Sequence, residues 1–201
     1  FTITLIASAG VGAVNMITED AIAEANRQAT VAAVANVLPA FEKSEMSTMT
    51  IDEMPINIYT AVDGSGAVVG YAVETMTMSG FSGKVRMMVG FDAEGTILNV
   101  NVLEQSETPG LGSKMCDEGN VLLASVQGKN PANLKLKVKK DGGDIDALTA
   151  ATISSRAYAD AVARAYEAFK EASGAQESTH GVSGATATHE GHDAQEGGDN
   201  E

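Results

Sequence analysis

The 201-residue chain, long enough for one medium domain, has few of the residues on which common active sites and cross-links depend. Its single cysteine, Cys116, excludes an internal disulfide and a metal site built from cysteines alone, and we expect it to be a small buried hydrophobic residue. All three histidines lie at or after residue 180, so no Ser-His-Asp set can be assembled in the body of the chain. No glycine-rich phosphate loop follows a predicted strand. These absences argue against a conventional hydrolase or P-loop enzyme.

Positive charge is also scarce, because 13 Lys and Arg stand against 27 Asp and Glu and leave a net charge of -14. An acidic surface repels phosphate backbones, and we therefore expect no nucleic-acid partner. No Lys or Arg follows Lys170, and the Gly-, Ser-, Thr- and acid-rich segment 173–201 is predicted to be a disordered acidic tail. Within that segment, His189 and His192 are three residues apart, but a flexible chain leaves both solvated, so we expect no metal site.

The longest uncharged run opens the sequence and begins with FTITLIASAGVGAVNMI, residues 1–17. At about 1.5 Å per residue it spans roughly 25 Å as a helix, slightly less than a ~30 Å hydrocarbon core. Because residues 18–38 continue directly in a helical pattern, we expect 1–17 to be a transmembrane helix that is incomplete at its N-terminus, with a cleaved signal peptide as the alternative. Glu19 and Asp20 follow, so the positive-inside rule favours a single-pass protein of the plasma (inner) membrane with its domain on the extracytoplasmic side.

Residues 56–103 alternate apolar and polar side chains with a period near two, interrupted by glycine turns such as GFSG. This pattern predicts four or five antiparallel strands, with the methionines at 76, 78, 87 and 88 in the core. Beyond them, NVLLASVQG (120–128) predicts a helix, NLKLKVKK (133–140) an edge strand, and residues 153–172 a long helix. We therefore predict an α+β domain over 51–172, with an antiparallel sheet flanked by helices, preceded by a connecting helix and linker over 18–50.

Two motifs stand out because their residues suit a bound cofactor. In ETPGLG, residues 107–112, Pro109 fixes φ, while Gly110 and Gly112 permit backbone angles that other residues avoid. The motif predicts either a plain turn or a shaped loop with exposed amides that approaches a planar ligand closely. The second motif, DALTAAT (146–152), stands at the start of the long helix. Its residues by themselves predict only a helix start.

The residues Asp146, Thr149, Ala150, Ala151 and Thr152 resemble the recognition motif of covalently flavinylated domains: Asp, two residues, Ser or Thr, Gly or Ala, Ala, Thr. Ala150 stands where glycine is commoner. Together with ETPGLG upstream and the predicted anchor, residues 1–170 resemble the G subunits of the Rnf electron-transfer complex, an ion-translocating ferredoxin:NAD oxidoreductase. The C subunit of the sodium-pumping NADH:quinone reductase is a relative with the same FMN-binding domain and remains an alternative.

The resemblance implies a membrane-anchored electron carrier rather than a catalyst that acts on a diffusible substrate. It implies FMN joined to Thr152 through a phosphoester, made from FAD by a separate flavin transferase, and other redox subunits as partners. The implied cofactor-binding residues are Glu107, Thr108, Gly110, Leu111, Gly112, Thr149, Ala151 and Ser154, and the implied transferase-recognition residues are Asp146, Thr149, Ala151 and Thr152. A stand-alone extracytoplasmic flavin reductase and a non-redox anchored domain that binds lipid or solute remain open.

A second copy of the motif core, Ser183 to Thr186, lies in the acidic tail. His180 takes the place of the aspartate, and the sequence predicts no strand before it and no helix after it. A flavin at Thr186 would have no pocket, so we predict a single flavin per chain.

Overall fold

The computed structural model describes residues 4, 18, 25 and 28–180, with side chains described as far as Gly174. Apart from Thr4, the predicted transmembrane helix 1–17 lies outside the described residues, and so does the second motif copy in the tail. Among the residues that are described, no helix has both the length and the apolar character needed to cross a membrane.

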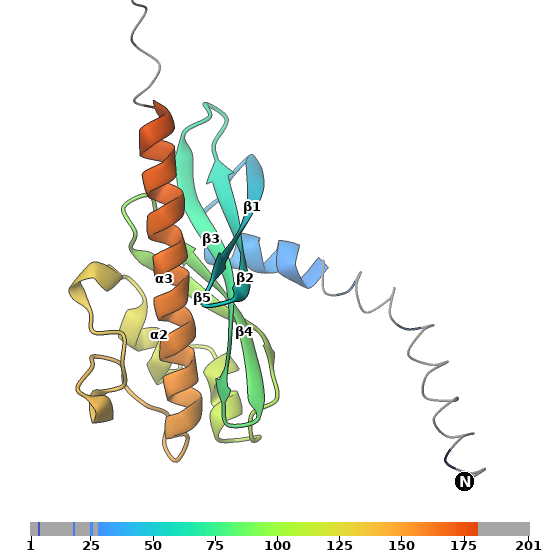
Figure 1. Cartoon of the computed structure of the whole chain (residues 1–201), viewed down its shortest axis with the longest axis vertical. Coiled ribbons are helices and arrows are strands. Elements are labelled where there is room, and N and C mark those ends of the chain that lie inside the picture. Colours follow the sequence, from blue (N-terminus) through green and yellow to red (C-terminus); the bar gives the residue numbers. More distant parts are fainter. Residues whose placement is uncertain (1–3, 5–17, 19–24, 26–27, 181–201) are drawn as a thin grey trace, which may run out of the picture.

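A five-stranded antiparallel sheet forms the centre of the domain, with its strands in sequence order (Figure 1). The strands are β1 (Lys43–Ile51), β2 (Met54–Val62), β3 (Val68–Gly80), β4 (Gly83–Phe91) and β5 (Ile97–Gln105). Each strand pairs with the next, from β1 with β2 to β4 with β5. The predicted α+β architecture with an antiparallel sheet is confirmed.

Strand β1 lies, except for its last residue Ile51, in the segment 18–50, for which the sequence predicts a connecting helix and linker. Its side chains are mostly exposed, so it lacks the alternation of apolar and polar residues that marks a half-buried strand. Pairing with β2 over the whole length from Lys43 opposite Val62 to Ile51 opposite Met54 forms the strand instead. The helical part of the same segment is present at residues 28–37.

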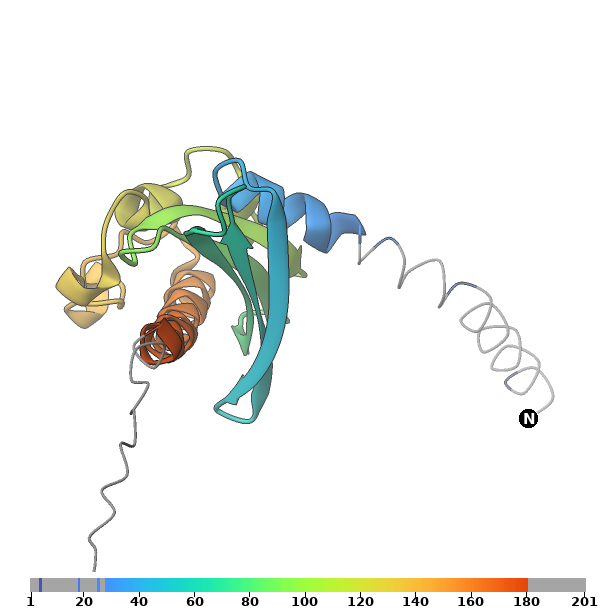
Figure 2. The ribbon, with the colours of Figure 1, turned by 90° about the horizontal axis from the view of Figure 1, so that it is seen from above.

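Two helices cover the two faces of the sheet (Figure 2). Helix α3 (Thr152–His180) packs on one face, where the main core includes Val73, Met87 and Tyr158. The helix over 28–37 packs on the other face, where a smaller core includes Val34 and Met88. Met87 and Met88 enter opposite cores because successive side chains of a strand point to opposite faces.

The four methionines predicted in the core differ in their burial. Met87 and Met88 are fully buried, Met76 is half-buried, and Met78 is 63% exposed. The prediction is therefore wrong for Met78, which lies two residues before the end of β3. Cys116 is also exposed, contrary to the expectation of a buried thiol. It ends a short 3₁₀ helix on the surface, a position that the residue type alone does not reveal.

The connection from β5 to α3 contains η1 (Gly112–Cys116), α2 (Val121–Val126), η2 (Pro131–Asn133) and η3 (Lys139–Asp141). Helix α2 confirms the predicted helix, and the Asn120 side chain caps it by accepting from the N–H groups of Leu122 and Leu123 at 3.0 Å each.

The edge strand predicted over 133–140 is wrong. These residues make local contacts, such as the Ile145 N–H donated to the Lys137 carbonyl at 3.0 Å, and a single bridge joins Val138 to Ile145. They pair with no strand of the sheet, since its order runs from β1 to β5.

Helix α3 ends later than the sequence predicts, at His180 rather than at residue 172. Residues 173–180, which the sequence places in the disordered tail, therefore continue the helix. Gly174 does not stop it, because a glycine inside a helix costs only about 1 kcal/mol and helix-forming residues surround it.

Candidate functional site

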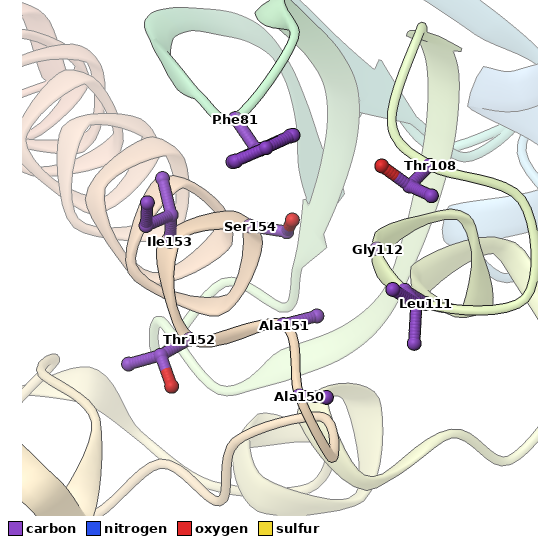
Figure 3. A pocket seen from close by; sticks show the side chains of 9 residues that line it. All are labelled: Phe81, Thr108, Leu111, Gly112, Ala150, Ala151, Thr152, Ile153 and Ser154. Carbon is purple, nitrogen blue, oxygen red and sulfur yellow. The ribbon is translucent and has the colours of Figure 1, made fainter.

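A cavity of about 310 Å³ brings the two sequence motifs together (Figure 3). Three segments enclose it: the turn between β3 and β4, the ETPGLG loop after β5, and the start of α3. The lining residues are Phe81, Thr108, Leu111, Gly112, Ala150, Ala151, Thr152, Ile153 and Ser154. The fold thus places the loop at 107–112 against the motif at 146–152, which the sequence separates by about forty residues.

Six of the predicted site residues line this cavity: Thr108, Leu111, Gly112, Ala151, Thr152 and Ser154. Glu107, Gly110, Thr149 and Asp146 do not line it. Phe81, Ala150 and Ile153 line the cavity but are absent from the predicted binding residues. For Phe81 the available signal was an aromatic residue at the tip of a glycine-flanked hairpin, GFSG, where a polar residue would be expected.

The start of α3 is shaped by the residues just before it. Ala150 has a φ of 59°, a left-handed backbone conformation, which explains why glycine is commoner there in the motif. The next residue, Ala151, donates its N–H to the Leu148 carbonyl at 3.1 Å, and its carbonyl accepts the Ser155 N–H at 3.0 Å. Thr152 is therefore the first residue of the helix, one residue before the start at 153 that the sequence predicts.

The first turn of α3 leaves three backbone donors open. Within the described part of the chain, no acceptor pairs with the N–H groups of Thr152, Ile153 and Ser154. Open N–H groups at a helix N-terminus, together with the positive end of the helix dipole, favour a bound anion such as a phosphate. Thr152 itself is half-buried and belongs to the lining of the cavity.

The ETPGLG loop is held by its own hydrogen bonds. The Thr108 carbonyl accepts the N–H groups of Leu111 at 3.1 Å and Ser113 at 3.3 Å, and the Gly110 N–H donates to the Ser113 hydroxyl at 3.0 Å. The Gly110 and Leu111 amides are therefore engaged inside the loop, contrary to the expectation that this loop exposes them. Leu111 instead offers its side chain, which is 39% exposed on the wall that faces the helix start.

The two glycines of the loop serve different purposes. Gly110 has a φ of 75°, so it needs the conformational freedom of glycine, as predicted. Gly112 does not have a positive φ. It is needed for space, because a Cβ atom at that position would lie 2.4 Å from the Ser154 hydroxyl.

Charged side chains near the helix start are paired with one another rather than directed into the cavity. Asp146 is exposed, and its carboxylate forms an ion pair with Lys139 at 2.7 Å. The backbone N–H of Asp146 donates to the Ser125 hydroxyl at 2.9 Å. Arg156 binds Asp141 through two contacts of 2.7 and 2.8 Å, and this guanidinium lowers the pKa of Asp141. An anion at this site would therefore be held mainly by the open backbone N–H groups of α3.

Residues 80–167, which include both motifs and the whole cavity lining, match the family model of the FMN-binding domain. This match supports FMN as the cofactor. The chain is also 35% identical over 173 residues to the G subunit of the ion-translocating oxidoreductase complex of Shewanella amazonensis, with 80% of each chain covered. It is 28% identical over 185 residues to the G subunit of the Na(+)-translocating ferredoxin:NAD(+) oxidoreductase complex of Acetobacterium woodii, with 86% of this chain and 89% of that protein covered.

Among solved structures, the crystal structure of Shewanella oneidensis NqrC matches 70% of this chain and 73% of its own, with a TM-score of 0.41 and 20% identity. The resemblance of the chain to the Rnf G subunits is confirmed by the sequence relatives. The chain belongs to the family of the G subunits of ion-translocating oxidoreductase complexes.

Proposed function

We propose that this protein is a membrane-anchored electron carrier with FMN joined covalently to Thr152, and that it acts as a subunit of an ion-translocating ferredoxin:NAD oxidoreductase complex. The observation that carries the proposal is the position of Thr152: the first residue of α3, at the edge of a cavity that joins the ETPGLG loop to the DALTAAT motif.

The residues of the site fit FMN in both its parts. The open N–H groups of the first turn of α3 suit the phosphate, and the small side chains of Ala150 and Ala151 leave room for it. Leu111 and Phe81 offer apolar walls for the flavin ring. The cavity of about 310 Å³ lies at the lower end of the usual range for small-molecule sites, ~300–1,000 Å³.

The site is built for holding a redox group rather than for acid–base catalysis. None of the described residues that line the cavity carries a titratable side chain. Bound FMN would supply the capacity to accept and release electrons, and the chain would fix its position and limit its contact with water. This arrangement favours a carrier over a reductase that must protonate a diffusible substrate.

The attachment step requires a second protein, a flavin transferase that uses FAD. The Thr152 hydroxyl oxygen would form a bond to the FMN phosphorus of FAD, the bond to the AMP phosphate would break, and AMP would leave as the hydroxyl proton is released. Asp146 and Thr149 are exposed beside the helix start, where a transferase can reach them. We assign them, with Ala151 and Thr152, to recognition by that enzyme.

Intact-mass measurement after co-expression with the transferase tests the proposal. The wild-type chain should gain the mass of one FMN less one water, and Thr152→Ala should lose this adduct, whereas Thr152→Ser should retain some because a hydroxyl remains. Thr186→Ala, in the second motif copy, is the matched control and should keep the adduct. Full modification of Thr152→Ala would refute the attachment site.

The placement of the flavin ring against ETPGLG has its own test. A side chain at Gly110 would meet open space, but the φ of 75° would strain it, so Gly110→Val should distort the loop without blocking Thr152. We expect the adduct to remain while the flavin absorption spectrum or potential shifts. An unchanged spectrum and potential would argue against this placement.

A further inference from the structure

Glu107 opens the ETPGLG motif, yet its side chain is turned into the protein and is only 4% exposed. Its carboxylate accepts the Ser82 N–H at 3.0 Å and the Phe81 N–H at 3.3 Å, both from the turn between β3 and β4. It also accepts the hydroxyl of Ser154, in the first turn of α3. One carboxylate therefore fastens together the three segments that enclose the cavity.

The surrounding backbone leaves space for this carboxylate at two glycines. A Cβ atom on Gly80 would lie 2.7 Å from one Glu107 oxygen, and a Cβ atom on Gly112 would lie 2.9 Å from the other. Side chains at these positions would displace the carboxylate. The Glu107 N–H is held as well, by the Gln105 side-chain oxygen at 2.7 Å.

The carboxylate of Glu107 is paired with hydrogen-bond donors rather than with a cation. None of the ion pairs among residues 28–180 includes it. In the protein interior little water is present to screen the field of this carboxylate. Phe81 and Ser154, which it holds directly, both line the cavity.

We propose that Glu107 is a positioning residue with two effects: it holds the Phe81 turn against the start of α3, and it places a fixed negative charge behind the cavity wall. Glu107 thus organises the site without itself binding the cofactor. The second effect rests on the proposed function, because it requires a flavin in the cavity. A negative charge beside the ring disfavours its reduction and lowers the potential.

Hydrogen exchange on the flavin-free protein tests the first effect independently of the cofactor. In Glu107→Gln the glutamine side chain has only one oxygen that can accept a hydrogen bond. It therefore cannot accept both the Phe81 N–H and the Ser82 N–H in the way that the two carboxylate oxygens do. We expect the Phe81 or Ser82 amide to lose protection by about tenfold or more, as for the loss of a hydrogen bond to a charged group. Glu118→Gln, at an exposed carboxylate, is the matched control and should leave both amides unchanged. Unchanged protection in Glu107→Gln would refute the positioning role.

Potentiometry on the flavin-loaded protein tests the second effect through its sign. Glu107→Gln removes the charge and should raise the potential. Ser154→Ala keeps the Glu107 carboxylate but removes a hydrogen bond that partly neutralises the carboxylate. The flavin potential should therefore fall. This variant also remains informative if Glu107→Gln does not fold. Shifts of the same sign in both variants, or no shift, would refute the charge effect.

If the wild-type chain carried no FMN, the proposed function would fail, and the exchange experiment would still decide whether Glu107 holds the turn.

Discussion

The Leu148 N–H donates to the hydroxyl of Ser155 at 3.0 Å, and that hydroxyl in turn donates to the Ala151 carbonyl at 2.8 Å. A serine near the start of α3 thereby holds the loop that leads into the helix. Both ends of this loop are buried at Leu148 and Ala151, whereas Thr149 and Ala150 between them are exposed. The result is a short accessible loop on a rigid base, directly before Thr152.

Ser155→Ala should destabilise the domain because it leaves the buried Leu148 N–H without its acceptor. We expect a loss of about 1–3 kcal/mol in the free energy of unfolding, measured by urea denaturation. Ser106→Ala, at an exposed serine, should change stability little. Equal stability of the two variants would show that the Ser155 bond does not hold the loop.

Ala150→Gly should stabilise the domain. An alanine with a φ of 59° costs about 1–2 kcal/mol in backbone strain, and glycine removes that strain. Glycine also makes the unfolded chain more flexible, which offsets part of the gain in stability. We expect a net gain of about 1 kcal/mol in urea denaturation. Ala147→Gly, nearby and without a positive φ, should instead be neutral or destabilising. A loss of stability in Ala150→Gly would contradict the strain at this position.

Cys116 should react with a maleimide in the native protein because its side chain is exposed. The reaction should be slow at neutral pH, since desolvation by the surrounding atoms and, secondly, the charge of the nearby Asp117 raise the pKa of the thiol and so lower its thiolate fraction. The labelling rate should therefore keep rising with pH above the ordinary thiol range. A native rate at neutral pH equal to that of the urea-unfolded chain would contradict the raised pKa.

Only one flavin should be attached per chain. Thr186 has the motif core around it, but His180 stands where the motif has its aspartate. Peptide mapping of the co-expressed protein should place FMN on the peptide that contains Thr152, and a chain ending at Gly174 should keep electron transfer. An FMN-bearing peptide with Thr186 in appreciable yield would overturn the single-flavin prediction.

The domain should face the extracytoplasmic side of the plasma membrane, because Glu19 and Asp20 directly follow the predicted anchor at 1–17. A protease added to right-side-out vesicles should remove the acidic tail first. Inverted vesicles provide the control, in which the tail should be protected. Cleavage only in inverted vesicles would reverse the orientation.

The sequence by itself determined the features that local patterns encode. Alternating residues and glycine turns predicted the meander from β2 to β5, and small residues before an alanine-rich run predicted a long helix from residue 153, one residue after the observed start of α3 at Thr152. The two motifs identified the family, because each is a short contiguous stretch. All these signals lie within a few residues of one another, where backbone preference and hydrophobic period act directly.

Only the tertiary structure decided what depends on contacts between distant residues. Strand β1 exists because β2 pairs with it, although its exposed side chains carry no strand pattern. The segment 133–140 has such a pattern but meets no strand, so it stays a loop. Glu107 is an organiser of the site rather than a lining residue because the fold brings Ser82 and Ser154, 25 and 47 residues away, within hydrogen-bond reach of one carboxylate. Burial and hydrogen-bond partners of this kind arise from the packing of distant segments, which a linear pattern does not contain.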